Sequence, residues 1–337
     1  MIRVALDAMG GDQAPHTEVD GAALALQELP ASFRLQLVGP SAALEADLGR
    51  HPELDRARIE LVEAPEVIGM SERPLQAVRR KRKSSLVVGI GLLAAGHTDA
   101  FISAGNTGAM LAASTVHLGL HDGVERATVG TLLPTVEHPV LLLDAGANVE
   151  CSARELVGFA HLGSVYMRDI QNRSKPKVGL LNVGEEEEKG TAIVKEAHHL
   201  LSQDTRINYV GNVEGRDLLG GHPKHGALDV VVCDGFVGNI LLKFSESLML
   251  LVRHVAEQAA PDLWGRKEIR AAFRVLDYSQ YGGAPLLGVK GISIICHGSS
   301  NANAIRNAIR VAVQSVEVGL AQHIAAEFAA PPAVGQA

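Results

Sequence analysis

Residues 100–112 read Ala-Phe-Ile-Ser-Ala-Gly-Asn-Thr-Gly-Ala-Met-Leu-Ala: a short apolar run, a polar Gly-rich turn and an apolar segment of helical character. No Asp, Glu, Lys or Arg occurs from Ala100 to His121, so the stretch has to be weighed as a membrane span. It contains too many Ser, Thr, Asn and Gly residues for a lipid-facing helix. We therefore interpret it as a strand, a Gly-rich turn and a buried helix.

The same unit recurs along the chain, since short apolar runs alternate with helical segments. Strands rich in Val, Ile and Leu that alternate with helices predict a parallel sheet covered by helices. The predicted helices include Ala153–Ile170, Thr191–Gln203 and Asn301–Glu327. The predicted strands are Ile2–Leu6, Arg34–Val38, Ile59–Val62, Ala100–Ser103, Val140–Leu143, Val178–Asn182, Ile207–Val210, Val230–Cys233 and Ile292–Cys296.

The composition limits the class of protein. Of the 337 residues 47% are apolar and 20% charged, which supplies a sizeable core and argues against global disorder. The net charge of −7 argues against a general nucleic-acid binder. The three cysteines lie far apart, so neither a disulfide framework nor a structural zinc site is expected. The first residues form a strand without a basic leader or an apolar signal segment, so we expect a cytoplasmic protein.

Polar turns follow most of the predicted strands. The carboxyl ends of parallel strands line the ligand crevice of an open sheet, and amides at a helix N-terminus bind phosphate. Turn and capping geometry explains any single turn equally well, but seven together favour an anion site at one sheet edge. These turns begin at Asp7, Ser103, Asp144, Asn182, Gly211, Cys233 and His297.

Three other patterns are given structural interpretations. Gly89-Ile-Gly91-Leu-Leu-Ala94 matches the dinucleotide-binding spacing, but no acidic residue follows at 111–115 and the segment fits one apolar helix from Ser84 to Gly96. His and Asp occur at acyltransferase-like spacings, but chance supplies such pairs and none lies in a Gly-rich turn. Cys296 and His297 are neighbours on a strand and point to opposite faces, so they make a poor nucleophile and base.

Two charged runs stand out. The basic run is Arg79, Arg80, Lys81, Arg82 and Lys83, and it fits either a solvated helix face or a docking patch for an acidic partner. The acidic run, residues 185–188, is interpreted as a solvated helix start and is followed by Lys189. Lys189 lies at the edge of the Gly-rich turns, where an ammonium group can hold phosphate or stabilise an oxyanion.

The turns closely resemble those of the PlsX family of bacterial acyl-[acyl-carrier-protein]:phosphate acyltransferases, and the resemblance extends from residue 1 to about residue 325. It implies a three-layer αβα Rossmann-like sandwich similar to that of phosphate acetyltransferase and the isocitrate dehydrogenase group. We expect one domain over residues 1–328, and the composition of residues 329–337 predicts a flexible tail. The matching motifs are Asp7-Ala-Met-Gly-Gly-Asp-x-Ala-Pro15, Ser103-Ala-Gly-Asn-Thr-Gly-Ala109, Leu143-Asp-x-Gly-Ala-Asn148, Leu181-Asn-Val-Gly184, Gly211-Asn-Val-Glu214, Cys233-Asp-Gly-Phe-x-Gly-Asn239 and Tyr281-Gly-Gly-Ala.

By matching positions, the resemblance implies that Lys189 and Asn239 are the catalytic pair. Lys189 would neutralise phosphate or the oxyanion, and Asn239 would donate a hydrogen bond. Arg79 to Lys83 become the candidate docking site for acyl-carrier protein. The candidate phosphate and substrate residues are Gly10, Gly11, Asp12, Ser103, Asn106, Thr107, Gly108, Asp144, Asn148, Asn182, Asn212 and Asp234.

The implied activity transfers a long-chain acyl group from acyl-carrier protein to inorganic phosphate and gives acyl phosphate for phospholipid synthesis. A thioester is already activated and phosphate is its own nucleophile, so a catalytic triad, a metal or a cofactor is not needed. Two alternatives stay open: a short-chain phosphate acyltransferase that uses acyl-CoA, and a non-enzymatic module that binds carrier protein or anions. The resemblance also implies a homodimer that works with a downstream membrane acyltransferase.

A protruding helical hairpin is predicted at about 240–276, with a long apolar helix at Phe236–Gln258 and a basic helix at Arg266–Leu276. Leu263 and Trp264 lie at its tip. Trp favours the membrane interface and clustered basic residues favour anionic lipid, so the tip is a candidate for peripheral contact with the inner face of the cell membrane. Packing of the hairpin on the partner subunit of a dimer explains the same pattern.

Overall fold

The computed structural model describes residues 1–259, 266–269 and 282–329. The chain divides into two compact units: unit 1 consists of Met1–Ala127 and Tyr281–Ala330, and unit 2 of Thr128–Gln280 and Pro331–Ala337. Two compact units can belong to one catalytic domain, so the predicted single domain over residues 1–328 stays a prediction.

Unit 1 is built on a parallel sheet with one antiparallel strand. Its strands follow the order β3-β2-β1-β4-β12-β11, and only β11 runs antiparallel to its neighbour β12. The carboxyl ends of β1, β4 and β12 are therefore adjacent. The strands are β1 (Ile2–Asp7), β2 (Phe33–Gly39), β3 (Ile59–Glu63), β4 (Ala100–Ser103), β11 (Ala284–Leu287) and β12 (Ile292–Ile295).

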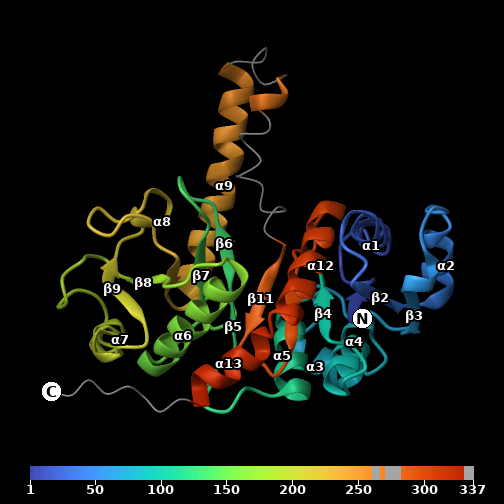
Figure 1. Cartoon of the computed structure of the whole chain (residues 1–337), viewed down its shortest axis with the longest axis horizontal. Helices are drawn as coiled ribbons and strands as arrows, with labels where there is room; N and C mark the ends of the chain where they lie inside the picture. Colours follow the sequence, from blue (N-terminus) through green and yellow to red (C-terminus); the bar gives the residue numbers. More distant parts are fainter. Residues whose placement is uncertain (260–265, 270–281, 330–337) are drawn as a thin grey trace. The chain divides into compact units, whose positions relative to one another are not determined.

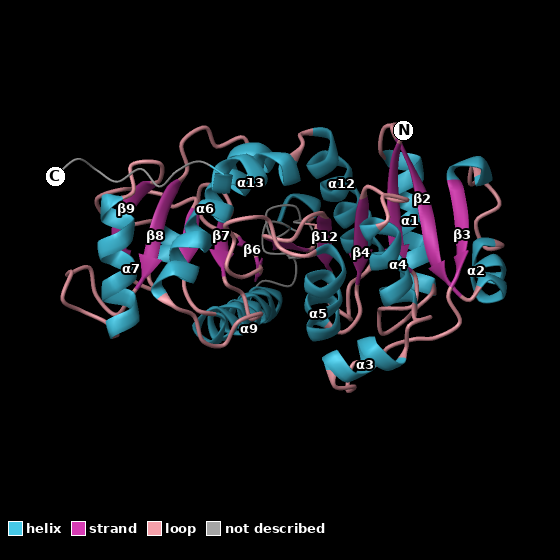
Figure 2. Cartoon of the chain, turned by 90° about the horizontal axis from the view of Figure 1, so that it is seen from below, coloured by secondary structure: helices cyan, strands magenta, loops and turns pink. Residues whose placement is uncertain are grey.

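Helices cover both faces of this sheet. α1 and α12 pack together on one face, and α4 and α5 pack together on the other (Figure 2). The contact is closest where Gly89 of α4 lies over the ring of Phe101, because a Cβ atom at Gly89 would stand 2.0 Å from the ring. The helices are α1 (His16–Glu28), α2 (Ser41–Leu48), α3 (Pro74–Arg80), α4 (Ser85–Ala94), α5 (Thr107–Leu118), α12 (Ala302–Glu317) and α13 (Leu320–Ala329), with a 3₁₀ turn at Arg56–Arg58.

Unit 2 repeats the layered plan with a smaller sheet. The strands follow the order β6-β7-β10-β8-β9, and β6 runs antiparallel to β7. α6 and α7 cover one face of the sheet, and α9 begins on the other and extends beyond the rest of the unit (Figure 1). The elements are β5 (Thr128–Val129), β6 (Thr131–Leu133), β7 (Val140–Leu143), α6 (Ala153–Ile170), β8 (Lys177–Leu181), α7 (Ala192–Gln203), β9 (Asn208–Val213), α8 (Asp217–Gly220), β10 (Val230–Val232) and α9 (Gly235–Ala259).

The predicted α/β class and the nine predicted strands are confirmed, with ends that differ from the prediction by at most three residues. Three corrections follow. The strands form two sheets, so the Gly-rich turns are shared between two sheet edges. The sequence analysis missed the short strands β5, β6 and β11. The predicted helix Asn301–Glu327 is wrong, because the chain breaks at Gly319, whose φ of 70° suits glycine and ends the helical path.

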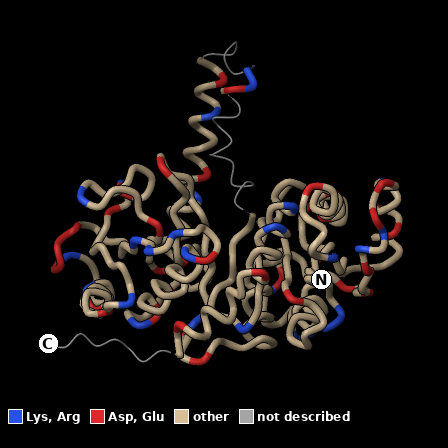
Figure 3. The backbone as a smooth tube through the Cα atoms, viewed as in Figure 1, with Lys and Arg blue, Asp and Glu red and all other residues tan. Residues whose placement is uncertain are grey.

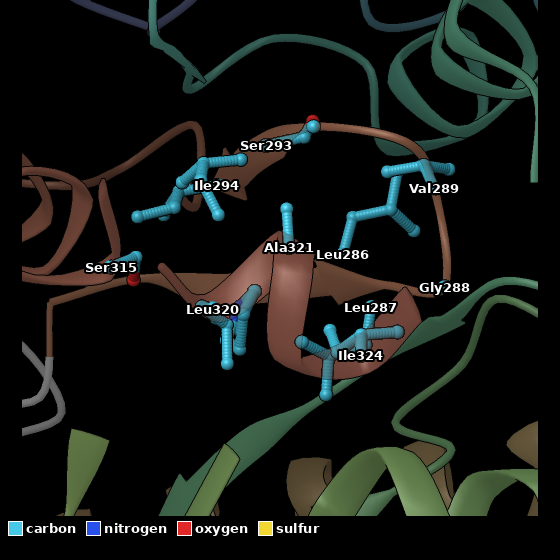
Figure 4. Close-up of a pocket in the computed structure, with 13 residues that line it drawn as sticks. Leu286, Leu287, Gly288, Val289, Ser293, Ile294, Ser315, Leu320, Ala321 and Ile324 are labelled. Atoms are coloured by element: carbon cyan, nitrogen blue, oxygen red, sulfur yellow. The ribbon is translucent and has the colours of Figure 1, made fainter. Parts of the chain in front are cut away.

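A small internal pocket in unit 1 lies between β11, β12 and α13 (Figure 4). Leu286, Val289, Leu320 and Ile324 line it, and its volume of about 10 Å³ has room for a single water molecule. The pocket is therefore a packing defect, too small for an acyl chain or a phosphate ion.

Candidate active site

Three loops meet at the carboxyl edge of the sheet in unit 1: those after β1, β4 and β12. A Cβ atom added to Gly10 would lie 2.6 Å from the Gly105 nitrogen, and one added to Gly298 would lie 2.9 Å from Oδ1 of Asp12. The Asp12 amide donates to the Gly298 carbonyl at 2.8 Å. Glycine is therefore required at position 10, where two backbones approach each other, whereas a side chain at position 298 would meet side chains that can move.

Asp7, at the end of β1, ties two of these loops together. Its Oδ2 accepts a hydrogen bond from the Ser103 hydroxyl at 2.7 Å, and its Oδ1 accepts one from the Met9 amide at 3.1 Å. The Ser103 hydroxyl in turn accepts a hydrogen bond from the Gly105 amide at 3.0 Å. Burial raises the pKa of Asp7. The Ser103 hydroxyl is therefore already used in stabilising the loop.

Asn106 is also used structurally. Its Oδ1 caps α5 by accepting from the Ala109 amide at 3.0 Å, and its Nδ2 lies 3.0 Å from the Met70 carbonyl, within reach of the Gly69 and Glu72 carbonyls. A side chain with so many partners has no capacity left for phosphate. The amides of Thr107 and Gly108, in the first turn of α5, are the groups there that a helix leaves for an anion.

Glu18 is a feature of this edge that the sequence analysis missed. It lies on α1, is 1% exposed, and accepts a hydrogen bond from the Gly11 amide at 3.1 Å. No motif marks it, because its neighbours at the loop come from residues 7–12 and 296–298. An acidic residue on the buried face of a predicted helix was the available signal.

In unit 2, Asp144 organises the loop after β7. Its Oδ1 accepts hydrogen bonds from the Gly146 and Ala147 amides at 3.0 Å each, and its Oδ2 accepts from the Asn148 amide at 2.8 Å and the Asn148 side chain at 2.6 Å. Burial raises the pKa of Asp144, and these four donors oppose that effect. Asp144 and Asn148 therefore stabilise each other and the turn.

The loop after β10 leads straight into α9. Asp234 caps this helix, because its Oδ1 accepts from the Val237 amide at 2.9 Å. A Cβ atom at Gly238 would lie 1.8 Å from the Asp144 carbonyl oxygen, so the first turn of α9 sits against the Asp144 loop. Asn239 is exposed next to this contact, and its Cβ packs against Gly146. Asn239 is thus placed on a rigid support with its amide exposed.

Lys189 lies in a loop, and this corrects one prediction: residues 185–188 precede α7 and do not start it (Figure 3). The side chains of two asparagines donate hydrogen bonds to carbonyl groups of this loop. Asn182 donates to the Lys189 carbonyl at 3.1 Å, and Asn212 donates to the Glu186 carbonyl at 3.2 Å. The Lys189 side chain is exposed and has no ion-pair partner within the described residues. Because β8 and β10 are neighbours in the sheet, their loops bring Lys189 and Asn239 to the same edge.

The basic run divides into two parts. Lys81 holds the neighbouring loop, since its Nζ lies 2.7 Å from the Val67 carbonyl and 2.5 Å from Glu72. Arg79, Arg80, Arg82 and Lys83 are exposed. The structure therefore leaves four of the five cations for a partner.

α9 exposes an apolar face. By length and composition it is the one helix within residues 1–259, 266–269 and 282–329 that could cross a membrane, and only 11% of its most apolar window is buried. Its exposed large apolar residues are Phe236, Ile240, Phe244, Leu250, Leu251, Val252 and Val255. All but Leu250 and Val252 follow spacings of four and seven, which places them on one side of the helix. Leu263 and Trp264 lie outside the described residues.

The thiols supply no nucleophile, because all three cysteines are buried. Burial raises the pKa of Cys296 to about 12 and that of Cys151 to about 12, and it raises the pKa of Cys233 as well. The described residues contain no group of three or more His, Cys, Asp and Glu side chains that could hold a metal ion. The groups available to a substrate at these sheet edges are backbone amides, a lysine and an asparagine. All of them are hydrogen-bond donors, which suits an anionic substrate.

Comparison with solved structures gives the fold. A phosphotransacetylase from Streptococcus pyogenes shares the fold, with a TM-score of 0.64, 16% identity and 94% of each chain covered. A branched-chain phosphotransacylase from Enterococcus faecalis V583 has a TM-score of 0.58 at 16% identity, over 94% of this chain and 99% of that one. The fold is thus the α/β fold of phosphotransacylases.

Sequence comparison gives the family. Residues 2–323 match the family described as "Fatty acid synthesis protein". A protein of Desulforamulus reducens named "Phosphate acyltransferase" is 47% identical over 329 residues, 95% of each chain, and one of Heliobacterium modesticaldum with the same name is 45% identical over 324 residues, 94% of each. The chain belongs to this family, the PlsX family.

The Asp144 network can be tested through stability. Asp144→Asn replaces a carboxylate, whose two oxygens accept four N–H groups, by an amide with one acceptor oxygen and one NH₂ donor. We therefore expect a loss of roughly 2 kcal/mol in the free energy of unfolding. Asp234→Asn is the matched control, because asparagine caps a helix as well as aspartate does. Urea unfolding measures both. Equal stability of the two variants would contradict a structural task for Asp144.

Proposed function

We propose that this chain transfers a long-chain acyl group from the thioester of acyl-carrier protein to inorganic phosphate, and so makes acyl phosphate for phospholipid synthesis. Membership of the PlsX family supports transfer of an acyl group to phosphate. The observation that carries the proposal is a pair of exposed polar residues that follow neighbouring strands, Lys189 in the loop after β8 and Asn239 near the start of α9. Asn182 and Asn212 donate hydrogen bonds to carbonyl groups of the Lys189 loop.

The chemistry matches what these residues supply. A phosphate oxygen attacks the thioester carbonyl, the new C–O bond forms, and the C–S bond breaks as the tetrahedral intermediate collapses. The leaving group is a thiolate, whose conjugate thiol has a pKa of about 8.5, so little acid assistance is needed. Lys189 neutralises the phosphate or the oxyanion, and Asn239 donates a hydrogen bond to it. In unit 1, the amides of Thr107 and Gly108 are a separate candidate for holding an anion.

This assignment predicts the effect of two substitutions. Lys189→Ala and Asn239→Ala should each lower turnover by roughly 10²-fold, because each removes a contact to charge that develops in the transition state. Lys195→Ala, an exposed lysine on α7, is the control and should keep normal turnover. The assay follows phosphate-dependent loss of acyl-carrier protein thioester and detects acyl phosphate. Near-normal rates in both site variants would move the assignment to the turn after Ser103.

The same assay separates the alternative functions. An enzyme that prefers short acyl-CoA would consume acyl-CoA faster than long-chain acyl-carrier protein when both are present. A binding module would retain carrier protein without phosphate-dependent thioester loss. The proposal is contradicted by either result.

The basic run is proposed as the docking site for acyl-carrier protein, which is small and acidic. A basic patch attracts such a partner mainly by raising the association rate. Arg79→Glu with Arg80→Glu should therefore raise the KM for the carrier-protein substrate by roughly tenfold at low salt and leave the KM for phosphate unchanged. Lys175→Glu with Lys195→Glu carries the same charge change elsewhere and should leave both constants unchanged. Lys81 is kept, since it holds a loop. Equal effects on both substrates would indicate a solvated run.

The exposed face of α9 and the predicted tip beyond it are proposed to serve two contacts. The face is covered by a second copy of the chain, which gives a homodimer, and the tip makes peripheral contact with the inner face of the cell membrane. The exposed apolar residues of α9 support the first, because a stripe of this kind needs a cover in water. Most of α9 is uncharged in Figure 3, which suits an apolar neighbour. A soluble enzyme in contact with the bilayer can pass its lipophilic product to a membrane acyltransferase.

The two contacts are separable. Leu263→Glu with Trp264→Glu should leave an active dimer that no longer co-sediments with anionic liposomes, because charge at the interface opposes insertion. Phe244→Glu with Leu251→Glu should instead shift sedimentation velocity from dimer to monomer. Loss of the dimer in the first variant, or unchanged liposome binding, would place the tip in the dimer contact.

A further inference from the structure

A buried acid lies behind the Gly10–Asp12 turn. Glu18 is 1% exposed; its Oε1 accepts the Gly11 amide, and its Oε2 is buried with no hydrogen-bond partner among the described residues. The contact is tight, because a Cβ atom at Gly11 would lie 2.2 Å from Oε1. An unpartnered, buried carboxyl oxygen is costly, so its presence here calls for a functional explanation.

The groups around Glu18 disfavour its negative charge. Asp7 at the end of β1 and Asp12 in the turn both face it, and the thiol of Cys296 at the end of β12 lies near it. Burial, with a smaller contribution from the two aspartates, raises the pKa of Glu18 to about 7. Glu18 therefore gains and loses its proton near neutral pH.

We propose that Glu18 is a positioning residue of the phosphate site: it fixes the Gly10–Asp12 turn through the Gly11 amide, and its proton sets the negative charge behind that turn. The inference rests on the proposed function and on the expectation from the sequence that the Gly10–Asp12 turn belongs to the phosphate site. With the proton present, the turn faces phosphate with a neutral group behind it. Loss of the proton adds a negative charge behind the turn, which repels a phosphate dianion.

The first test is the KM for inorganic phosphate from pH 6 to 8.5, at saturating acyl-carrier protein thioester, in the wild type and Glu18→Gln. Glutamine keeps the acceptor for Gly11 but cannot ionise. The ratio of wild-type KM to Glu18→Gln KM cancels the ionisation of phosphate itself, and it should rise roughly three- to tenfold across this range, with kcat nearly unchanged. Glu125→Gln, an exposed glutamate of unit 1, should give a flat ratio.

The second test needs no activity. The pKa of Glu18 is higher in the folded than in the unfolded chain, so its stabilising effect is complete below about pH 4.5 and is lost as pH rises to about 7. Between pH 5.5 and 8 the wild type should therefore lose roughly 4 °C in Tm relative to Glu18→Gln. Glu18→Met removes the acceptor for Gly11 and should raise the phosphate KM at every pH.

The outcomes are distinct. Parallel Tm curves for the wild type and Glu18→Gln would overturn the inference, because Glu18 would then not titrate. Diverging Tm curves with a flat KM ratio would overturn its link to phosphate while the proposed function stands. Absence of any phosphate-dependent thioester loss in the wild type would instead overturn the proposed function, and the inference with it.

Discussion

Each unit depends on one buried carboxylate that must find hydrogen-bond donors where a strand ends. Asp7 does this after β1 and Asp144 after β7. A carboxylate removed from water is tolerated only when backbone amides and side-chain donors surround it, so the chain must turn back over it. Glycines next to these loops follow from this constraint, because a Cβ at Gly10 would collide with the backbone of Gly105, and one at Gly238 in α9 with the carbonyl oxygen of Asp144. The first role of these Gly-rich motifs is therefore to surround a buried carboxylate with hydrogen-bond donors, and any binding of a substrate comes in addition.

That constraint decides which polar residues remain for a substrate. Ser103, Asn106 and Asp144 are used by the loops themselves, whereas Lys189 and Asn239 end in exposed groups. The sequence motifs do not distinguish these two sets, because residues that stabilise a turn and residues that are free to meet a substrate occur in the same kind of motif. Only the hydrogen-bond partners distinguish them.

The fold was largely predictable, and its failures have local physical causes. Apolar runs such as Ala100–Ser103 and Val140–Leu143 are strands with the predicted bounds, because they are buried on both faces. β6 and β11 are short and antiparallel, so neither carries a long apolar run. Gly319 is a weak signal in the sequence for the end of a helix, because glycine also occurs inside helices. Glu18 was missed because its partners come from loops distant in sequence, and only the packing of α1 on the sheet brings them together.

An enzyme of this kind gains little from a protein nucleophile. In the proposed reaction the thioester already carries the activation and phosphate attacks directly, so catalysis consists of bringing phosphate to the thioester carbonyl and stabilising one oxyanion. The buried cysteines, whose pKa values are raised, are consistent with this, because a reactive thiol near the site would compete with phosphate for the acyl group. The remaining electrostatic problem is that the loops which shape the site are built on carboxylates. In the proposed roles, each unit lessens this repulsion in its own way: a protonated Glu18 in unit 1 withholds a negative charge, and the exposed Lys189 in unit 2 supplies a positive one.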